Sequence, residues 1–169
     1  MADIDILAKK IAKWEGGYVN DPTDKGGATN MGVTIGTWQK VGYDKNHDGH
    51  IDKEDIKLLT PDDFKYVLRS VWNTWKADEI KSQKVADILV DWVWGSGMWG
   101  VKIPQRILGL KEDGIIGNVT ISKINSCSEK ELINKIYAAR EEFLDNIVKH
   151  NVSQAKFIKG WKNRLEDFK

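Results

Sequence analysis

A glutamate, an aspartate and a threonine follow one another at short intervals near the start of the 169-residue chain, as Glu15, Asp24 and Thr29. Cleavage of a glycosidic bond commonly needs one carboxylic acid that protonates the leaving oxygen, and a second polar group that manages water or the developing cation. Such an acid keeps its proton near neutral pH when apolar groups partly bury it. Glu15 directly follows Trp14 and is suited to such an environment, and the other two residues could face it.

The same residues also fit a structure without catalysis. A glutamate at a helix end beside Gly16 and Gly17 is usually a solvated surface residue. Asp-Lys-Gly-Gly at 24–27 is a common turn sequence. Spacing alone therefore leaves both interpretations open.

The elements that would position these residues are an amphipathic helix and a small β element. Apolar residues recur at intervals of three and four at Ile4, Leu7, Ile11 and Trp14. This pattern predicts a helix that ends near residues 14–16, where paired glycines break it. Strand-forming residues at 18–19 and 33–35 flank the turn sequence at 24–27, which predicts a short hairpin or an irregular two-stranded ribbon.

Most of the remaining chain has helical patterns. Thr60, Pro61 and Asp63 form a helix-start signal, since threonine is a good N-cap and proline suits the first helical position. Helices are predicted at 36–43, from 60, and at 82–97, 100–110, 118–126, 128–149 and from 153. The predicted fold class is mainly α with one small β element.

Four short motifs in the first segment carry a family resemblance. They are Glu-Gly-Gly-Tyr at 15–18, Asn-Asp-Pro at 20–22, Asp-Lys-Gly-Gly at 24–27 and Thr-Asn-Met-Gly-Val-Thr at 29–34. Together they resemble the signature of glycoside hydrolase family 108, the predicted N-acetylmuramidases. They are also similar to phage-type lysozymes, in which a helix-terminal glutamate precedes an aspartate by nine residues. The resemblance implies a lysozyme-like α+β fold, with a small β-hairpin after the first helix and a helical C-terminal half.

The resemblance also implies roles for individual residues. Glu15 would be the general acid, Asp24 would hold the attacking water or stabilise oxocarbenium charge, and Thr29 would help to position that water. Neighbouring residues would contact the sugar, and we assign this substrate-binding role to Tyr18, Asn30, Thr34 and Trp99.

Residues 91–126 resemble the predicted peptidoglycan-binding region that accompanies these enzymes. Two positions depart from the family pattern, with Gly95 where many relatives have Asn and Asn118 where they have Pro. We therefore expect a glycosidase half at 1–80 and a helical half at 81–169, packed as one unit. The helical half could equally complete a single core or bind glycan.

A second motif lies within the first half, at residues 44–55. Its side chains match the twelve-residue calcium loop of EF-hands, with a glycine at the sixth position and an apolar residue at the eighth. The last position is Asp55, where EF-hands usually have a bidentate glutamate. The pattern favours a structural Ca²⁺ over an ion-free acidic turn, and its predicted ligands are Asp44, Asn46, Asp48, the backbone carbonyl of His50, Asp52 and Asp55.

Composition restricts the remaining possibilities. Twenty-six basic and 25 acidic residues give a formal net charge of +1, which does not indicate a nucleic-acid partner. The single cysteine, Cys127, excludes an internal disulfide framework. The N-terminus lacks the pattern of a secretory signal, and no apolar run predicts a membrane anchor. We expect synthesis in the cytoplasm, a holin-like route to the cell wall, and a monomer.

The predicted function is hydrolysis of the bond between N-acetylmuramic acid and N-acetylglucosamine in peptidoglycan, without a catalytic cofactor. The family is associated with phage lysis as endolysins and with wall remodelling for export, where some members are labelled secretion activators. Two alternatives remain, a lytic transglycosylase on the same substrate and a non-catalytic, calcium-stabilised wall-binding protein.

Overall fold

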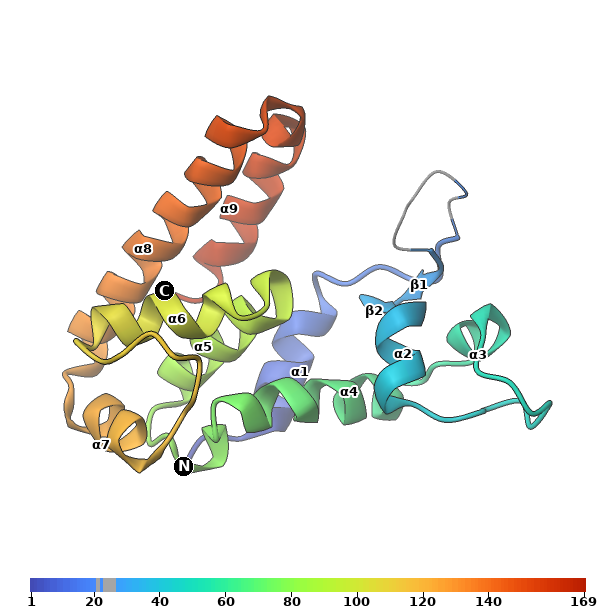
Figure 1. Cartoon of the computed structure of the whole chain (residues 1–169), viewed down its shortest axis with the longest axis horizontal. Coiled ribbons are helices and arrows are strands. Elements are labelled where there is room, and N and C mark those ends of the chain that lie inside the picture. The colour runs from blue at the N-terminus through green and yellow to red at the C-terminus, as the bar shows by residue number, and fades with distance from the viewer. Residues whose placement is uncertain (21, 23–26) are drawn as a thin grey trace. The chain divides into compact units, whose positions relative to one another are not determined.

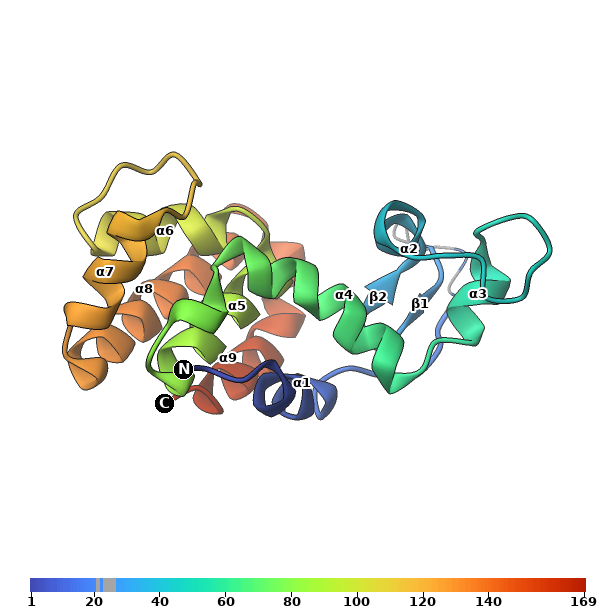
Figure 2. The same ribbon diagram turned by 90° about the horizontal axis from the view of Figure 1, so that it is seen from below.

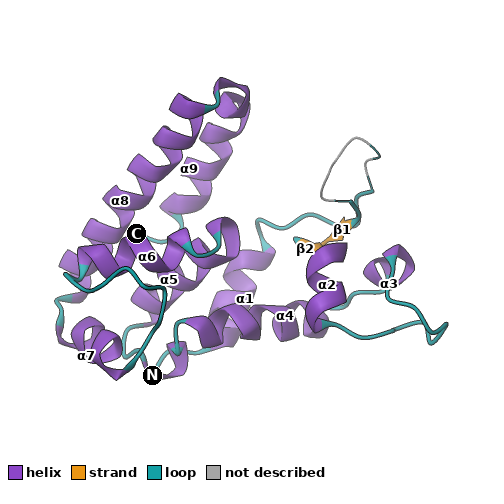
Figure 3. Cartoon of the chain, in the orientation of Figure 1, coloured by secondary structure: helices purple, strands orange, loops and turns teal. Residues whose placement is uncertain are grey.

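Helices make up most of the chain in the computed structural model, and one two-stranded sheet follows the first helix (Figures 1 and 3). The structure describes residues 1–20, 22 and 27–169. These residues divide into an N-terminal unit, residues 4–70, and a C-terminal unit, residues 1–3 and 71–169. The predicted mainly α fold, with a hairpin after the first helix and a helical C-terminal half, is confirmed.

The N-terminal unit holds the β element and the shorter helices. Its elements are α1 (Ile4–Ala12), β1 (Thr29–Asn30), β2 (Val33–Thr34), α2 (Ile35–Val41), α3 (Lys53–Lys57) and most of α4 (Pro61–Thr74). Helix α1 ends earlier than predicted, because the Trp14 backbone N–H donates to the Ile11 carbonyl at 2.8 Å and closes a tighter turn. Glu15 therefore lies beyond the helix, in the segment that leads to the sheet.

Side-chain caps fix where two helices of this unit begin. The predicted start of α4 is confirmed, since the Thr60 backbone N–H donates to Oδ2 of Asp63 at 2.7 Å and the Asp63 backbone N–H donates to Oγ1 of Thr60 at 3.4 Å. A second capping box, between Asp52 and Asp55, begins α3. That short helix is absent from the sequence prediction, because Asp52 and Asp55 were interpreted as calcium ligands.

The C-terminal unit is a group of packed helices (Figure 2). They are η1 (Ala77–Glu79), α5 (Gln83–Ser96), α6 (Trp99–Ile107), α7 (Asn118–Ser126), α8 (Glu129–His150), η2 (Val152–Phe157) and α9 (Ile158–Glu166). Helix α5 contacts α6 and α8, and α8 contacts α9. Gly100 permits the close approach of α6, because a Cβ there would lie 2.5 Å from the Val93 backbone nitrogen in α5.

A buried ion cluster joins three helices of the C-terminal unit. Asp91 of α5 is fully buried, and its two carboxylate oxygens each accept from an arginine at 2.6 Å, Arg140 of α8 and Arg164 of α9. A buried carboxylate without partners would be strongly unfavourable, so removal of either arginine would destabilise this packing. Large apolar side chains fill the surrounding core, among them Trp72, Trp75, Ile88, Leu89, Trp92, Ile136 and Phe168.

Of the helices that the described residues form, none combines the length and the apolar character that a lipid bilayer requires.

Candidate active site

The sheet that follows α1 is a tight hairpin. Strands β1 and β2 are antiparallel, with Thr29 opposite Thr34 and Asn30 opposite Val33. The turn between them consists of Met31 and Gly32, which both have positive φ angles of 50° and 75°. Two consecutive positive φ angles are typical of a type I′ turn, whose twist matches that of the two strands. The predicted hairpin is confirmed, with this turn joining its strands.

Backbone hydrogen bonds attach the Glu15 segment to this hairpin. Val19 and Thr29 exchange two N–H to carbonyl bonds, each 2.8 Å long. The Met31 backbone N–H donates to the Gly16 carbonyl at 2.9 Å. The backbone on both sides of residues 17–18 is therefore fixed against β1 and the turn, although it belongs to no regular element.

The Glu15 carboxyl group lies directly against Gly32. A Cβ atom added at Gly32 would lie 2.3 Å from Oε2 and 2.5 Å from Cδ of Glu15, closer than real Cβ atoms approach their neighbours. Gly32 thus serves two purposes, because it adopts the positive φ of the turn and leaves room for the carboxyl group. Glu15 itself is half-buried.

The two faces of the hairpin differ in burial. Asn30 and Val33 lie on the buried face, 8% and 1% exposed, and the Asn30 side-chain N–H donates to the Ile56 carbonyl of α3 at 2.9 Å. Thr29 and Thr34 share the other face, where both are half-buried. The contact that the structure shows for Asn30 is thus one that anchors the hairpin to α3.

Two of the other predicted substrate-binding residues have defined surroundings. Thr34 caps α2, since its Oγ1 accepts from the Thr37 backbone N–H at 3.1 Å and donates to the Thr37 hydroxyl at 3.0 Å. Tyr18 is half-buried, and Nζ of Lys57 lies 5.7 Å from its ring centroid. A cationic amine beside an aromatic ring contributes a weak attraction that helps to hold the ring.

The remaining predicted residues lie elsewhere. Asp24 is outside the described residues. Trp99 belongs to the C-terminal unit, where its side chain is 56% exposed. Within the N-terminal unit, the structure therefore brings the Glu15 carboxyl group to Gly32 of the hairpin turn. Along the chain, Gly32 is two residues from Thr34 and three from Thr29.

This arrangement suits acid catalysis on a bound chain. The half-buried Glu15 carboxyl group lies against the backbone turn. Thr29 lies on the half-buried face of the strands, opposite Thr34, whose hydroxyl group is bonded to Thr37. Hydroxyl groups both donate and accept, so they can hold a water molecule or a sugar hydroxyl.

The loop at 44–55 is ordered by its own hydrogen bonds. Asp44 accepts from the backbone N–H groups of His47 and Gly49 at 2.7 and 2.8 Å. Asn46 accepts from the Asp48 N–H at 3.0 Å, and Asp48 accepts from the His50 N–H at 2.9 Å. Each predicted ligand in the first half of the loop thus also shapes the backbone that follows it.

Asp55 closes the loop from its far end. The side chain is fully buried, and its oxygens accept from the backbone N–H groups of Lys45 at 2.7 Å, Asn46 at 3.3 Å and Asp52 at 2.8 Å. Burial acts to raise the pKa of Asp55, but these N–H donors hold it below its usual value.

The donor chemistry of the loop is compatible with calcium, because all predicted ligand atoms are oxygens. Among the described residues, however, no three His, Cys, Asp or Glu side chains gather as a group that could hold a metal ion. Calcium binding therefore stays a prediction.

Sequence reasoning missed the turn against which Glu15 lies. Met31 and Gly32 form the hairpin turn, and the prediction placed the turn at 24–27. A glycine between strand-forming residues was an available signal, since type I′ turns favour glycine at their second central position. Nothing in the sequence showed that the carboxyl group of Glu15 would lie on that glycine.

Comparisons with known proteins identify the family of the chain. The family model described as glycosyl hydrolase 108 matches residues 8–97, and that described as predicted peptidoglycan domain matches residues 99–166. Among solved structures, the chain is similar to SagA of Brucella abortus, with 29% identity and a TM-score of 0.77 over 98% of this chain and 90% of that chain. No curated protein matches the chain. The chain therefore belongs to glycosyl hydrolase family 108, and it is a lysozyme-type glycoside hydrolase that acts on peptidoglycan.

Proposed function

We propose that this enzyme hydrolyses the glycosidic bond between N-acetylmuramic acid and N-acetylglucosamine, with Glu15 as the general acid. The observation that carries the proposal is the position of the Glu15 carboxyl group, half-buried and seated on Gly32 of the hairpin turn. A catalytic acid must lie within hydrogen-bond distance of its target oxygen, and a misplacement of about 1 Å is costly, so a position against the turn supports this role.

In the proposed reaction, Glu15 gives its proton to the leaving glycosidic oxygen as positive charge develops on the sugar ring. Asp24 stabilises that charge or orients the attacking water, and Thr29 helps to place the water. Tyr18 contacts the sugar from the segment that follows Glu15, and Thr34 contacts it from β2. Asn30 supports the hairpin from its buried face.

The test compares Glu15→Gln with the unchanged enzyme on purified peptidoglycan. Glutamine has nearly the same shape but cannot protonate the leaving group, so activity should fall by about 10²–10⁴-fold. Glu142→Gln provides a matched control, because Glu142 is an exposed residue of α8. Full activity of Glu15→Gln in a turbidity or zymogram assay would refute the proposal.

Mass spectrometry of the released fragments identifies the reaction. Hydrolysis adds one water molecule to each cleaved bond, whereas a lytic transglycosylase closes a 1,6-anhydro ring without it. Sedimentation with sacculi but no soluble fragments would instead indicate a non-catalytic wall-binding protein.

We further propose that the loop at 44–55 binds a structural Ca²⁺. The support is the sequence pattern, together with the oxygen-only donor set of Asp44, Asn46 and Asp48. A ligand that binds only the folded state raises the melting temperature by mass action. Calcium should therefore raise the melting temperature of the chelator-treated protein, and Asp44→Ala should abolish this effect. An unchanged melting curve would show that the loop holds no ion.

A further inference from the structure

A groove of about 650 Å³ lies between α6 and α8 of the C-terminal unit. Apolar side chains from both helices line it, with Trp99 and Ile103 from α6 and Phe143 and Ile147 from α8. Its volume is in the range of sites that hold small organic ligands. All of these residues lie within the part of the chain that matches the predicted peptidoglycan domain.

Trp99 is the most exposed of these apolar groups. Its side chain is 56% exposed, whereas Trp38, Trp72, Trp75 and Trp92 are fully buried. A tryptophan combines a large apolar ring with one N–H donor, which suits surfaces that are apolar at one end and wet at the other. The flat ring can stack on the C–H face of a sugar, so it provides a platform for a glycan.

Three polar side chains, Arg106, Asn146 and His150, also line the groove. Two hydrogen bonds of 2.7 Å to Glu112 hold the Arg106 guanidinium. Nδ1 of His150 lies 2.8 Å from the backbone carbonyl of Asn146, which can only accept, so Nδ1 is the donor and the ring is held in place. The exposed Asn146 amide can both donate and accept, as an acetamido group requires.

A smaller pocket of about 200 Å³ lies near the groove and shares one lining residue with it, Ile147. Arg140 and Arg164 line this pocket, and hydrogen bonds to the buried Asp91 hold both guanidinium groups in place. Among the described residues, those lining the groove and the pocket include no Asp or Glu. Glu112 pairs with Arg106, but the two arginines of the pocket share the single carboxylate of Asp91, so these three groups together carry one positive charge. A carboxylate is the complementary ligand, because guanidinium groups bind carboxylates with strong, charge-assisted hydrogen bonds.

We propose that the groove and the arginine pocket together bind a peptide-bearing glycan strand of peptidoglycan, at a different segment of the polymer from the one that is cleaved. An N-acetylated sugar stacks on Trp99, and a carboxylate of its stem peptide enters the pocket that Arg140 and Arg164 line. The inference rests on the proposed function, because the C-terminal unit would bind another part of the polymer that the enzyme cleaves.

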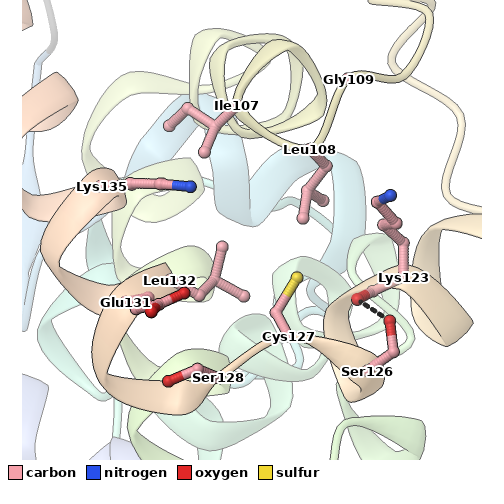
Figure 4. A pocket seen from close by; sticks show the side chains of 10 residues that line it. All are labelled: Ile107, Leu108, Gly109, Lys123, Ser126, Cys127, Ser128, Glu131, Leu132 and Lys135. Atoms are coloured by element: carbon pink, nitrogen blue, oxygen red, sulfur yellow. Dashed lines mark hydrogen bonds between the residues drawn. The ribbon is translucent and has the colours of Figure 1, made fainter.

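A third pocket offers a comparison within the same unit. It has a volume of about 490 Å³ and lies among the end of α6, α7 and the start of α8, where the Lys135 side chain and the Cys127 thiol point into it (Figure 4). It presents amines, hydroxyls and a thiol instead of an aromatic ring. We therefore expect it to contribute nothing to glycan stacking.

The first experiment measures binding without cleavage. The full-length chain carrying Glu15→Gln is sedimented with purified sacculi, alone and with Trp99→Ala added. We expect Trp99→Ala to weaken binding about tenfold, the effect of removing an aromatic anchor from a binding site. Tyr66→Ala is the matched control, since Tyr66 is 57% exposed and lies in the N-terminal unit. Lys135→Ala tests the pocket in Figure 4.

The second experiment tests the arginine pocket with Ser96, which also lines it. Ser96→Glu places a carboxylate beside the arginines, and Ser96→Gln adds the same bulk without charge. The probes are a soluble disaccharide-tetrapeptide and glycan strands from which an amidase has removed the peptides. We expect Ser96→Glu, but not Ser96→Gln, to weaken binding of the first probe several-fold and to leave the second unchanged.

The outcomes separate this inference from the catalytic proposal. If Trp99→Ala binds sacculi as tightly as its parent while keeping its melting temperature, the groove is not a glycan site, whatever Glu15→Gln does to cleavage. If Lys135→Ala alone weakens binding, the site lies at the other pocket and the inference is wrong. Equal effects of Ser96→Glu on both probes would overturn the assignment of the peptide carboxylate.

Discussion

Gly32→Ala is the substitution that best tests how Glu15 is positioned. The added Cβ would lie 2.3 Å from Oε2 of Glu15, whereas carbon and its non-bonded neighbours normally stay about 3.5 Å apart. The carboxyl group must therefore move by roughly 1 Å. A displacement of that size can lower a catalysed rate by about 10²-fold, because the acid no longer meets the leaving oxygen.

The cost in stability should be much smaller than the loss in rate. Alanine at a positive φ costs about 1–2 kcal/mol, which lowers the melting temperature of a chain of this size by a few degrees. The clashing atoms belong to the far end of a flexible side chain, which can move without disturbing the hairpin. We expect a folded enzyme with a low kcat.

The assay compares initial rates on soluble peptidoglycan fragments with melting curves of the same samples. Gly36→Ala is the matched control, because its Cβ would meet only the Thr34 hydroxyl, at 3.9 Å, and helix α2 tolerates alanine. If Gly32→Ala folds and keeps the kcat of the unchanged enzyme, the seat of the carboxyl group on the turn has no catalytic role and the argument for Glu15 fails.

Three further substitutions test the packing around the site and in the C-terminal unit. Asn30→Ala removes the side-chain donor of the Ile56 carbonyl and leaves it the longer bond from the Leu59 N–H, at 3.4 Å. The free energy of unfolding in urea should therefore fall by about 1 kcal/mol, and an unchanged value would contradict the anchoring role. Burial acts to raise the pKa of Asp63, but hydrogen bonds from neighbours including Lys45 hold this pKa below its usual value. The ionised carboxylate therefore stabilises the fold above about pH 4, the usual pKa of an aspartate, and this contribution is lost as the pH falls through the lowered pKa. Melting curves of Asp63→Asn should therefore vary less between pH 7 and pH 3 than those of the unchanged protein. Gly100→Ala would press a Cβ against the α5 backbone at 2.5 Å and should cost about 1–3 kcal/mol, whereas Gly95→Ala, with open space around it, should cost nothing.

Local sequence signals predicted the elements well. The Thr60-Pro61-Asp63 signal placed the start of α4 correctly, because the residues that form a cap are close in sequence. Apolar periodicity located the longer helices for the same reason. The end of α1 was placed a turn too late, since Trp14 continues the apolar pattern after the backbone has left the helix.

The candidate site was predictable only in its residue types. The family-like motif indicated Glu15. The position of its carboxyl group against Gly32 depends on the turn at Met31 and Gly32, which the sequence prediction did not place there. Asn30 illustrates the same limit. Its amide donates to a carbonyl 26 residues away, and such a contact follows from tertiary packing.

The α3 anchor has a dynamic consequence. One end of α3 is tied to the 44–55 loop through Asp55, and the carbonyl of Ile56, the next residue, accepts from Asn30 in the hairpin. Loop, helix and hairpin should therefore open and close as one cooperative segment in amide hydrogen exchange. Slower amide exchange in the 44–55 loop would be accompanied by slower exchange at Met31. A more rigid loop would thus make the hairpin turn against which Glu15 lies more rigid as well.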